Sequence, residues 1–375
     1  KYNPLIIDSG VYDASTPHRA NYAARTIAHN TVTIFDPNEE FFGGTWGQQQ
    51  SSEYSTVNDG GQLYTPSPPG VEACGPGTKY DRGDIIAYDR NPWYTYTAGD
   101  ATRSYKSTKV NEFIRGFIHL KPDMFVVFDR VESTDSTFKK RWLLHSINKP
   151  QINNKTVTLT NGSGSVTCQT IYPPQVQIDT VGGPGHRFEV NGQNFPPAKE
   201  DPEAGSWRVE ISPDDSSRRD YFLHVLQTGD NTPDAPSVEL LQNPDSLGVR
   251  IVQNDTIYEI KFTTTGNLTG RISIDSAGIQ MMNKKMAVPS PKILNQPEGT
   301  NVCPNSRANF TLKVNYATDY QWQVDTGSGF HHLSNEGMYT GVNTDSLKIS
   351  GATPEMADYK YRCVVSNSTD TLNSN

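Results

Sequence analysis

VNEFIRGFIHLKPDMFVVFDRV, residues 110–131, contains two runs of β-branched and aromatic residues, FIRGFIHL (113–120) and MFVVFDRV (124–131). Such runs favour extended strands, and turn-forming residues bound them. Similar runs recur along the chain, as TVTIF (31–35), KTVTLT (155–160), WRVEIS (207–212), YFLHVLQT (221–228), LGVRIVQ (247–253) and TIYEIKFTT (256–264). No long stretch has a helical period. The sequence therefore predicts an all-β protein with a large antiparallel β-sandwich.

The charge balance narrows the class of partner. The chain has 33 Lys and Arg against 41 Asp and Glu, a net charge of −8, and the basic residues form no cluster. Nucleic acid is therefore excluded as a partner, because it needs a basic face. An acidic polysaccharide remains compatible, since a groove can be basic within an acidic protein. The absence of a long apolar run predicts no membrane span.

The N-terminal residue is Lys1, and neither an initiator Met nor a signal peptide is present in the 375 residues. This start predicts that the chain is the C-terminal part of a longer protein, with any export signal upstream. The length is sufficient for two or three domains.

A proline-rich segment, MAVPSPKILNQPEG (286–299), follows the last strand-like run of the large unit and reads as a linker. It predicts a domain over 1–288 and a second one over 289–375. The second has Cys303 and Cys363, with Trp322 between them and Tyr361 two residues before the second cysteine. This arrangement is typical of an immunoglobulin-like sandwich with an inter-sheet disulfide. A disulfide would indicate an oxidising compartment, and Cys74 and Cys168 are expected to be free.

The pair His29-Asn30 stands directly before the strand-like run TVTIF. One interpretation is a histidine whose ring is satisfied by a backbone carbonyl. The other gives it partners: Asp59, in the turn Asn58–Gln62, and Asp100, just after the aromatic run WYTY (93–96). A histidine nitrogen with one or two carboxylate oxygens can hold a zinc-like ion. The residues alone leave both interpretations open.

Charged and aromatic residues give further candidates. Arg115 and Arg141 lie inside strand-like runs, where a structural ion pair is the favoured role and an acidic sugar the alternative. Trp46, Tyr64, Trp93, Tyr94 and Tyr96 lie in or near the Gly- and Pro-rich loop over 43–82; they suit either the core or stacking on sugar rings. No serine-nucleophile elbow, phosphate-binding loop, dinucleotide fingerprint or HExxH helix occurs.

Several motifs together resemble one family. In order they are HNTVTIFDPNE, NDGGQ, YTYTAGDATRSY, VNEFIRGFIHLKPDMFVVFDRV, KRWLLHS, VGGPGHRFEVNGQNF and GSWRVEISP. Over residues 5–280 they resemble the C-terminal β-sandwich region of the heparinase II/III family of polysaccharide lyases. The resemblance implies an upstream α/α toroid that shares a groove with the sandwich. It also implies β-elimination at a uronic acid, with a Tyr and a His of the toroid transferring protons.

Carried onto this chain, the resemblance makes His29 a catalytic groove residue or a zinc ligand. Asp59 would be the carboxylate ligand, and Asp100 stands where the family generally has a third ligand, a histidine. The substrate-binding candidates are Asn30, Trp46, Tyr94 and Arg115. A groove-shaping zinc ion is the implied cofactor.

The resemblance also sets expectations for the whole protein. It implies a secreted, periplasmic or cell-surface polysaccharide lyase that acts on glycosaminoglycan-like polymers. Lyases of this type are often homodimers. This chain is expected to be inactive without its toroid. The alternatives are a non-catalytic carbohydrate-binding or cell-surface structural protein and, less favoured, an accessory domain of a hydrolase.

Overall fold

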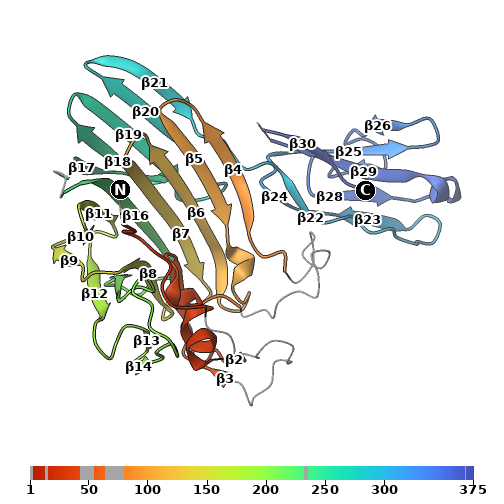
Figure 1. Ribbon diagram of the computed structural model, residues 1–375. Coiled ribbons are helices and arrows are strands. Elements are labelled where there is room, and N and C mark those ends of the chain that lie inside the picture. The colour runs from red at the N-terminus through yellow and green to blue at the C-terminus, as the bar shows by residue number, and fades with distance from the viewer. Residues whose placement is uncertain (1–2, 13–15, 43–54, 64–79, 232–234, 368) are drawn as a thin grey trace. The chain divides into compact units, whose positions relative to one another are not determined.

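The computed structural model describes residues 3–12, 16–42, 55–63, 80–231, 235–367 and 369–375 (Figure 1). The chain divides into two compact units, Lys1–Met286 and Ala287–Asn375. The first unit ends two residues before position 288, where the sequence places the boundary. Trp46 and Cys74 lie outside the described residues.

The first unit is built on an eight-stranded antiparallel sheet (Figure 1). Several of the apolar runs of the sequence form its strands, and each strand pairs with its spatial neighbours. Its strands, in spatial order, are β4 (Asp84–Arg90), β5 (Tyr94–Asp100), β6 (Val110–Leu120), β7 (Met124–Ser133), β16 (Arg219–Asp230), β11 (Gly164–Tyr172), β10 (Thr156–Asn161) and β9 (Gln151–Asn153).

A four-stranded sheet packs on one face of this sheet. Its order is β1 (Val32–Phe35), β8 (Lys139–Ser146), β15 (Trp207–Pro213) and β12 (Val176–Gly182). The core between the two sheets contains Val32, Trp142 and Ile211 from the smaller sheet and Val127 and Val131 from β7. Because side chains alternate along a strand, every second residue of β7 points into this core.

A five-stranded sheet covers the other face. It is the meander β17 (Ser237–Asn243), β18 (Ser246–Gln253), β19 (Thr256–Thr263), β20 (Gly270–Ser276) and β21 (Ile279–Lys285). Phe262 of β19 stacks on Phe128 of β7, with ring centroids 4.7 Å apart. Phe128 follows Val127, whose side chain points into the first core. Because side chains alternate along a strand, the Phe128 side chain points to the opposite face, into this second core. The predicted antiparallel β-sandwich is therefore confirmed, and it has three layers.

Short elements close one end of the unit. They are the helical turns η1 (Arg19–Ala23), η2 (Thr26–Ala28) and η5 (Thr102–Ser104) and the strand pairs β2 (Phe41–Phe42) with β3 (Ser55–Thr56) and β13 (Glu189–Val190) with β14 (Gln193–Asn194). A separate apolar cluster packs η1, η2 and β13 against β8, and it includes Tyr22, Ile27, Leu143, Phe188 and Val190. The segment before β1 thus lies against β8 through packing that strand patterns do not encode.

The second unit is an immunoglobulin-like β-sandwich. One sheet is β23 (Arg307–Thr311), β28 (Ser346–Ser350) and β27 (Tyr339–Thr340), and the other is β26 (Phe330–His332), β25 (Asp319–Asp325), β29 (Lys360–Ser366) and β30 (Thr371–Asn373). The strands β22 (Lys292–Asn295) and β24 (Lys313–Asn315) pair with each other, and the turn η6 (Pro354–Asp358) precedes β29. Trp322 is fully buried between the sheets, as its spacing predicts.

The predicted disulfide is wrong. Cys303 and Cys363 are both free, and Cys303 is exposed whereas Cys363 is buried in the core. Cys303 precedes β23, so its side chain is not on the strand that faces the partner sheet; Ala308 of β23 is buried in that core instead. A disulfide needs two cysteines whose Cβ atoms point toward each other at close range, and the exposed Cys303 does not face the core that holds Cys363. Cys168 is a free, buried thiol, in line with its predicted state.

Among the described residues, no helix has the length and apolarity needed to cross a membrane.

Candidate active site

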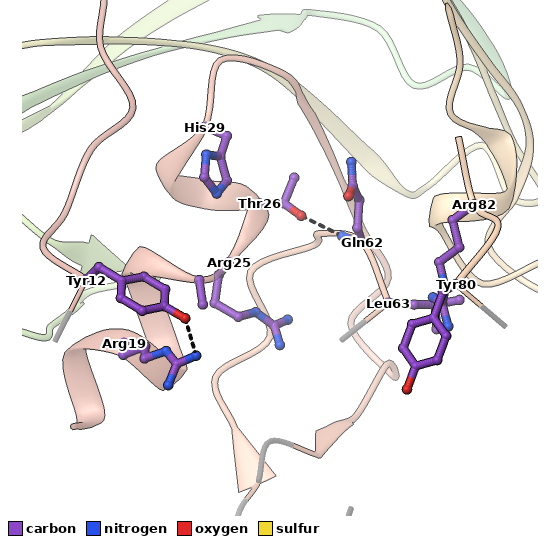
Figure 2. A pocket seen from close by; sticks show the side chains of 10 residues that line it. Tyr12, Arg19, Arg25, Thr26, His29, Gln62, Leu63, Tyr80 and Arg82 are labelled. Carbon is purple, nitrogen blue, oxygen red and sulfur yellow. Dashed lines mark hydrogen bonds between the residues drawn. The ribbon is translucent and has the colours of Figure 1, made fainter. Parts of the chain in front are cut away.

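A pocket of about 380 Å³ lies beside the His29 segment (Figure 2), in the size range of small-ligand sites. Three arginines and a histidine contribute to its wall, and no Asp or Glu is among the described residues that line it. The lining residues are Tyr12, Arg19, Ala24, Arg25, Thr26, His29, Gln62, Leu63, Tyr80 and Arg82. Arg25 is paired with the buried Asp59, so Arg19 and Arg82 are the lining arginines that bring positive charge for an anion, although the chain as a whole is acidic.

His29 is positioned by the turn that precedes β1. Its backbone N–H donates to the Thr26 carbonyl at 3.1 Å, and its own carbonyl accepts from Thr31 at 3.0 Å. This closes η2 and turns the chain into the strand. The His29 ring is half-exposed and lines the pocket, with Nδ1 3.2 Å from Oδ1 of Asp8. Because Asp8 faces Nδ1, Nε2 is the ring nitrogen left to contact a bound molecule.

Asn30 has a structural role. Its side-chain Nδ2 donates to the Ile7 carbonyl at 2.8 Å, and its Oδ1 accepts from the backbone N–H of His145 at 2.9 Å. These bonds join the N-terminal segment to β8. Asn30 is not among the pocket-lining residues, so its predicted part in substrate binding finds no support in this geometry.

Asp59 is fully buried and engaged in a network of donors. Its Oδ1 accepts from Nη2 of Arg25 at 2.7 Å and from the Gly61 N–H at 3.1 Å, and its Oδ2 accepts from the Ile27 N–H at 3.1 Å. The Arg25 guanidinium also lies 4.0 Å from the centre of the Phe41 ring. Asp59 thus joins the turn at 58–62 to η2.

Asp100 does a different task, since its Oδ1 accepts from the Thr102 N–H at 2.9 Å and so begins η5. The predicted zinc ligands His29, Asp59 and Asp100 therefore do not converge. Within the part of the chain that the structure describes, no group of three or more His, Cys, Asp or Glu side chains is arranged to hold a metal ion. The donor set does not fit zinc at this place, which corrects the predicted ligands.

Arg115 and Tyr94 are also engaged within the fold. Arg115 forms two hydrogen bonds with the buried Asp129, from Nε at 2.6 Å and from Nη2 at 2.8 Å, and Nη1 donates to the Asn30 carbonyl at 2.7 Å. This is the ion pair that the sequence favoured over sugar binding. The Tyr94 hydroxyl donates to Asp89 at 2.7 Å, and burial, followed by this carboxylate, raises the pKa of Tyr94. Neither residue lines the pocket.

The sequence missed several pocket residues, among them Tyr12, Arg19, Tyr80 and Arg82. Arg19 donates from Nη2 to the Tyr12 hydroxyl at 2.7 Å, and Figure 2 shows the two side chains side by side. Arg82 stands on the opposite wall in the same view, and burial lowers its pKa from a very high ordinary value. No strand pattern or long helical period marks these residues. Tyr12 lies before η1, Arg19 is the first residue of that short helical turn, and Tyr80 and Arg82 lie before β4.

Comparison with known proteins gives a family match. The family described as "Heparinase II/III-like, C-terminal" matches residues 1–210, which is more than half of the 375 residues. No curated protein matches the chain.

Solved structures give weaker similarities. Heparan sulfate lyase HepC from Pedobacter heparinus has 14% identity and a TM-score of 0.35, over 55% of this chain and 28% of that one. One heparinase III structure has 13% identity and a TM-score of 0.44, over 76% and 34%. Another heparinase III structure has 10% identity and a TM-score of 0.40, over 64% of this chain and 30% of that one. The chain thus spans about a third of the length of these structures or less.

Proposed function

Because this chain, through residues 1–210, belongs to the family of the C-terminal region of heparinase II/III-like polysaccharide lyases, we propose that it serves in β-elimination at a uronic acid. Its pocket would bind the sugar carboxylate of an acidic, glycosaminoglycan-like polysaccharide. The observation that carries the proposal is the placement of His29 in a pocket lined by arginines and by no described carboxylate.

The reaction makes clear demands on such a pocket. A base removes the proton on C5, the electron pair of that bond forms the C4–C5 double bond, and the C4–O bond breaks. The leaving oxygen takes a proton from an acid. The carboxylate on C5 must be neutralised for its neighbouring proton to leave, and cationic side chains supply that stabilisation.

The residues of the pocket fit these roles. Arg19 and Arg82 bring positive charge for the carboxylate. His29, paired with Asp8, presents Nε2 for proton transfer to or from the sugar. The Tyr80 side chain lines the pocket across from His29 in Figure 2. We assign His29 as the catalytic residue of this domain.

The proposal extends to the rest of the protein. A helical α/α toroid, as the resemblance implies, would complete the groove, and the chain by itself would then bind polysaccharide but be inactive as a lyase. Its substrates lie outside the cytoplasm, so we propose a secreted, periplasmic or cell-surface location. A homodimer stays a prediction.

The test measures binding and cleavage separately. Heparan sulfate, chondroitin sulfate, hyaluronan and alginate are titrated into the chain, and cleavage is followed by the ultraviolet absorbance of the unsaturated product, with any longer protein that carries this domain assayed alongside. We expect Arg19→Ala to weaken binding about tenfold or more, because one charge-assisted contact is lost. In the longer protein, where cleavage is expected, His29→Ala should slow it by about 10²- to 10⁴-fold.

The matched control is Arg250→Ala, since Arg250 is a surface arginine of β18 that pairs loosely with Glu259 at 3.6 Å. It should leave binding and cleavage unchanged. Binding without any absorbance change in the longer protein would favour the alternative, a non-catalytic carbohydrate-binding protein. No binding to any of the four polymers would remove the support for both.

A further inference from the structure

Asp59, which the sequence suggests as a zinc ligand, forms an ion pair with Arg25 instead. Arg25 and Asp59 form an ion pair at 2.7 Å, and their side chains are 1% and 0% exposed. We infer that Arg25 is a positioning residue that takes the place of a metal ion, so that this pocket keeps its shape without one. The inference concerns the frame of the pocket and stands whether or not the proposed function is correct.

The charges at this position balance without a metal. Asp59 brings one negative charge and Arg25 one positive charge, and three hydrogen bonds engage the two carboxylate oxygens. A divalent ion placed against Asp59 would meet the guanidinium at close range. Repulsion between two buried cations of that kind is costly, because the low dielectric of the interior screens them poorly.

Arg25 links elements that form two walls of the pocket. It precedes η2, whose Thr26 lines the pocket and leads to His29. Asp59 lies in the turn that carries Gln62 and Leu63 to the pocket. The Gln62 N–H donates to Thr26 Oγ1 at 2.7 Å, which ties the two walls together beside the ion pair.

A second buried cation secures the same turn. Lys109, 1% exposed, donates from Nζ to the Gly61 carbonyl at 2.7 Å and is paired with Glu39. Space at Gly61 is so restricted that a Cβ there would lie 2.5 Å from Asp59 Oδ2 and from Thr26. Gly60, with φ +72°, lies against β1, where its carbonyl accepts from the Ile34 N–H at 2.7 Å. Within the described residues, side chains and backbone groups thus hold the turn from three sides.

The first experiment uses the unaltered 375-residue chain. Metal content is measured by elemental analysis, and the melting temperature is recorded with EDTA, without it, and with added Zn²⁺. We expect no stoichiometric metal and the same melting temperature in all three conditions. One bound metal ion per chain, together with a lower melting temperature after chelation, would overturn the inference even if no variant could be made.

The second experiment measures coupling between the two side chains. Arg25→Met, Asp59→Asn and the double variant are compared by melting temperature. Each single variant is expected to melt lower, and the double variant is expected to lose clearly less than the sum of the single losses, because each single change leaves a buried group unpaired. Additive losses would contradict the inference. Arg19→Met is the matched control, since Arg19 lines the same pocket but is only partly buried, and it should change the melting temperature little.

The third measurement separates positioning from stability alone. At a temperature where all variants are folded, Arg25→Lys should retain most of the binding of heparan sulfate or of whichever of the four polymers binds, while Arg25→Met should lose it. Equal binding by both variants would argue against a positioning role. If the unaltered chain binds none of the polymers, the proposed function fails, and the chelation and coupling results still decide the inference.

Discussion

At the scale of single residues, the interior of the first unit contains neutral histidines. His224 is fully buried and stacks on Trp142 with ring centroids 3.9 Å apart, and its Nδ1 lies 3.2 Å from Thr170 Oγ1. Burial lowers the pKa of His224 to about 3. Burial also lowers the pKa of His145 well below its ordinary value, although its Nε2 lies 2.9 Å from the Ile27 carbonyl.

Because of these two histidines, the folded protein is expected to lose stability in acid. The unfolded chain takes up a proton at each histidine near pH 6.5, whereas folded His224 does so only near pH 3. Between these pH values the unfolded state binds more protons than the folded state. The free energy of unfolding therefore falls as the pH is lowered below 6.5, by about 1.4 kcal/mol per pH unit for each such histidine. Urea unfolding between pH 7 and pH 4 measures this slope.

The histidine variants assign the effect. His224→Phe keeps the stacking on Trp142 and should give a shallower dependence on pH, because one proton-binding difference is gone. His186→Gln serves as the control, since the His186 side chain is 63% exposed beside Glu189, and it should leave the slope unchanged. A slope that is equal in the unaltered protein and in His224→Phe would show that His224 does not cause it.

At the scale of elements, glycines decide how closely the strands and sheets approach. Gly248 of β18 is paired with Lys261 of β19, and a Cβ built on it would lie 2.1 Å from the Ile260 carbonyl oxygen. Gly116 of β6 lies under the Phe262 ring, where a Cβ would come within 3.1 Å. The residues of these strands are typical strand formers, but the need for glycine arises from the neighbouring strand and the neighbouring sheet.

Gly248→Ala is expected to destabilise the first unit by about 2 to 4 kcal/mol, because a backbone oxygen, which has no alternative rotamer, must shift to make room. The control is Gly99→Ala in β5, where the nearest atom to a new Cβ would be 3.7 Å away, an ordinary contact. Free energies of unfolding from urea denaturation compare the two. A loss no larger at Gly248 than at Gly99 would contradict the close approach of β18 and β19.

At the scale of the whole molecule, the two units have separate cores, each with a free cysteine inside it. Cys168 lies between the sheets of the first unit, and Cys363 lies beside Trp322 in the second. Burial raises the pKa of Cys168 to about 12 and that of Cys363 to about 11. Cys303 is exposed.

Alkylation under native conditions at neutral pH should therefore label Cys303 and leave Cys168 and Cys363 unlabelled, since the reagent reaches only an accessible thiol. Unfolding in denaturant without a reductant should expose all three to the reagent. Peptide mapping by mass spectrometry reads each site separately. Recovery of a Cys303–Cys363 cross-linked peptide from the unreduced protein would contradict the structure and restore the disulfide that the sequence predicts.

The sequence predicted the strands better than the site. FIRGFIHL and MFVVFDRV lie within β6 and β7, and TVTIF contains β1, because strand patterns are local. It also predicted that Arg115 would form an ion pair. It did not predict Arg19 or Arg82 in the pocket, since a short helical turn and an irregular segment show no period. It grouped His29, Asp59 and Asp100 by residue type, and type alone does not say which carboxylate already has a partner.

The sequence by itself determined the all-β class, the apolar faces of the strands, the buried Trp322 and the family, because each depends on residue order along a local stretch or on an ordered set of motifs. Only the tertiary structure decided that Arg25 pairs with Asp59 across 34 positions and that Cys303 lies off the strand facing Cys363. Charge pairing and side-chain burial are settled by distances between segments remote in sequence, and those distances exist only once the sheets have packed.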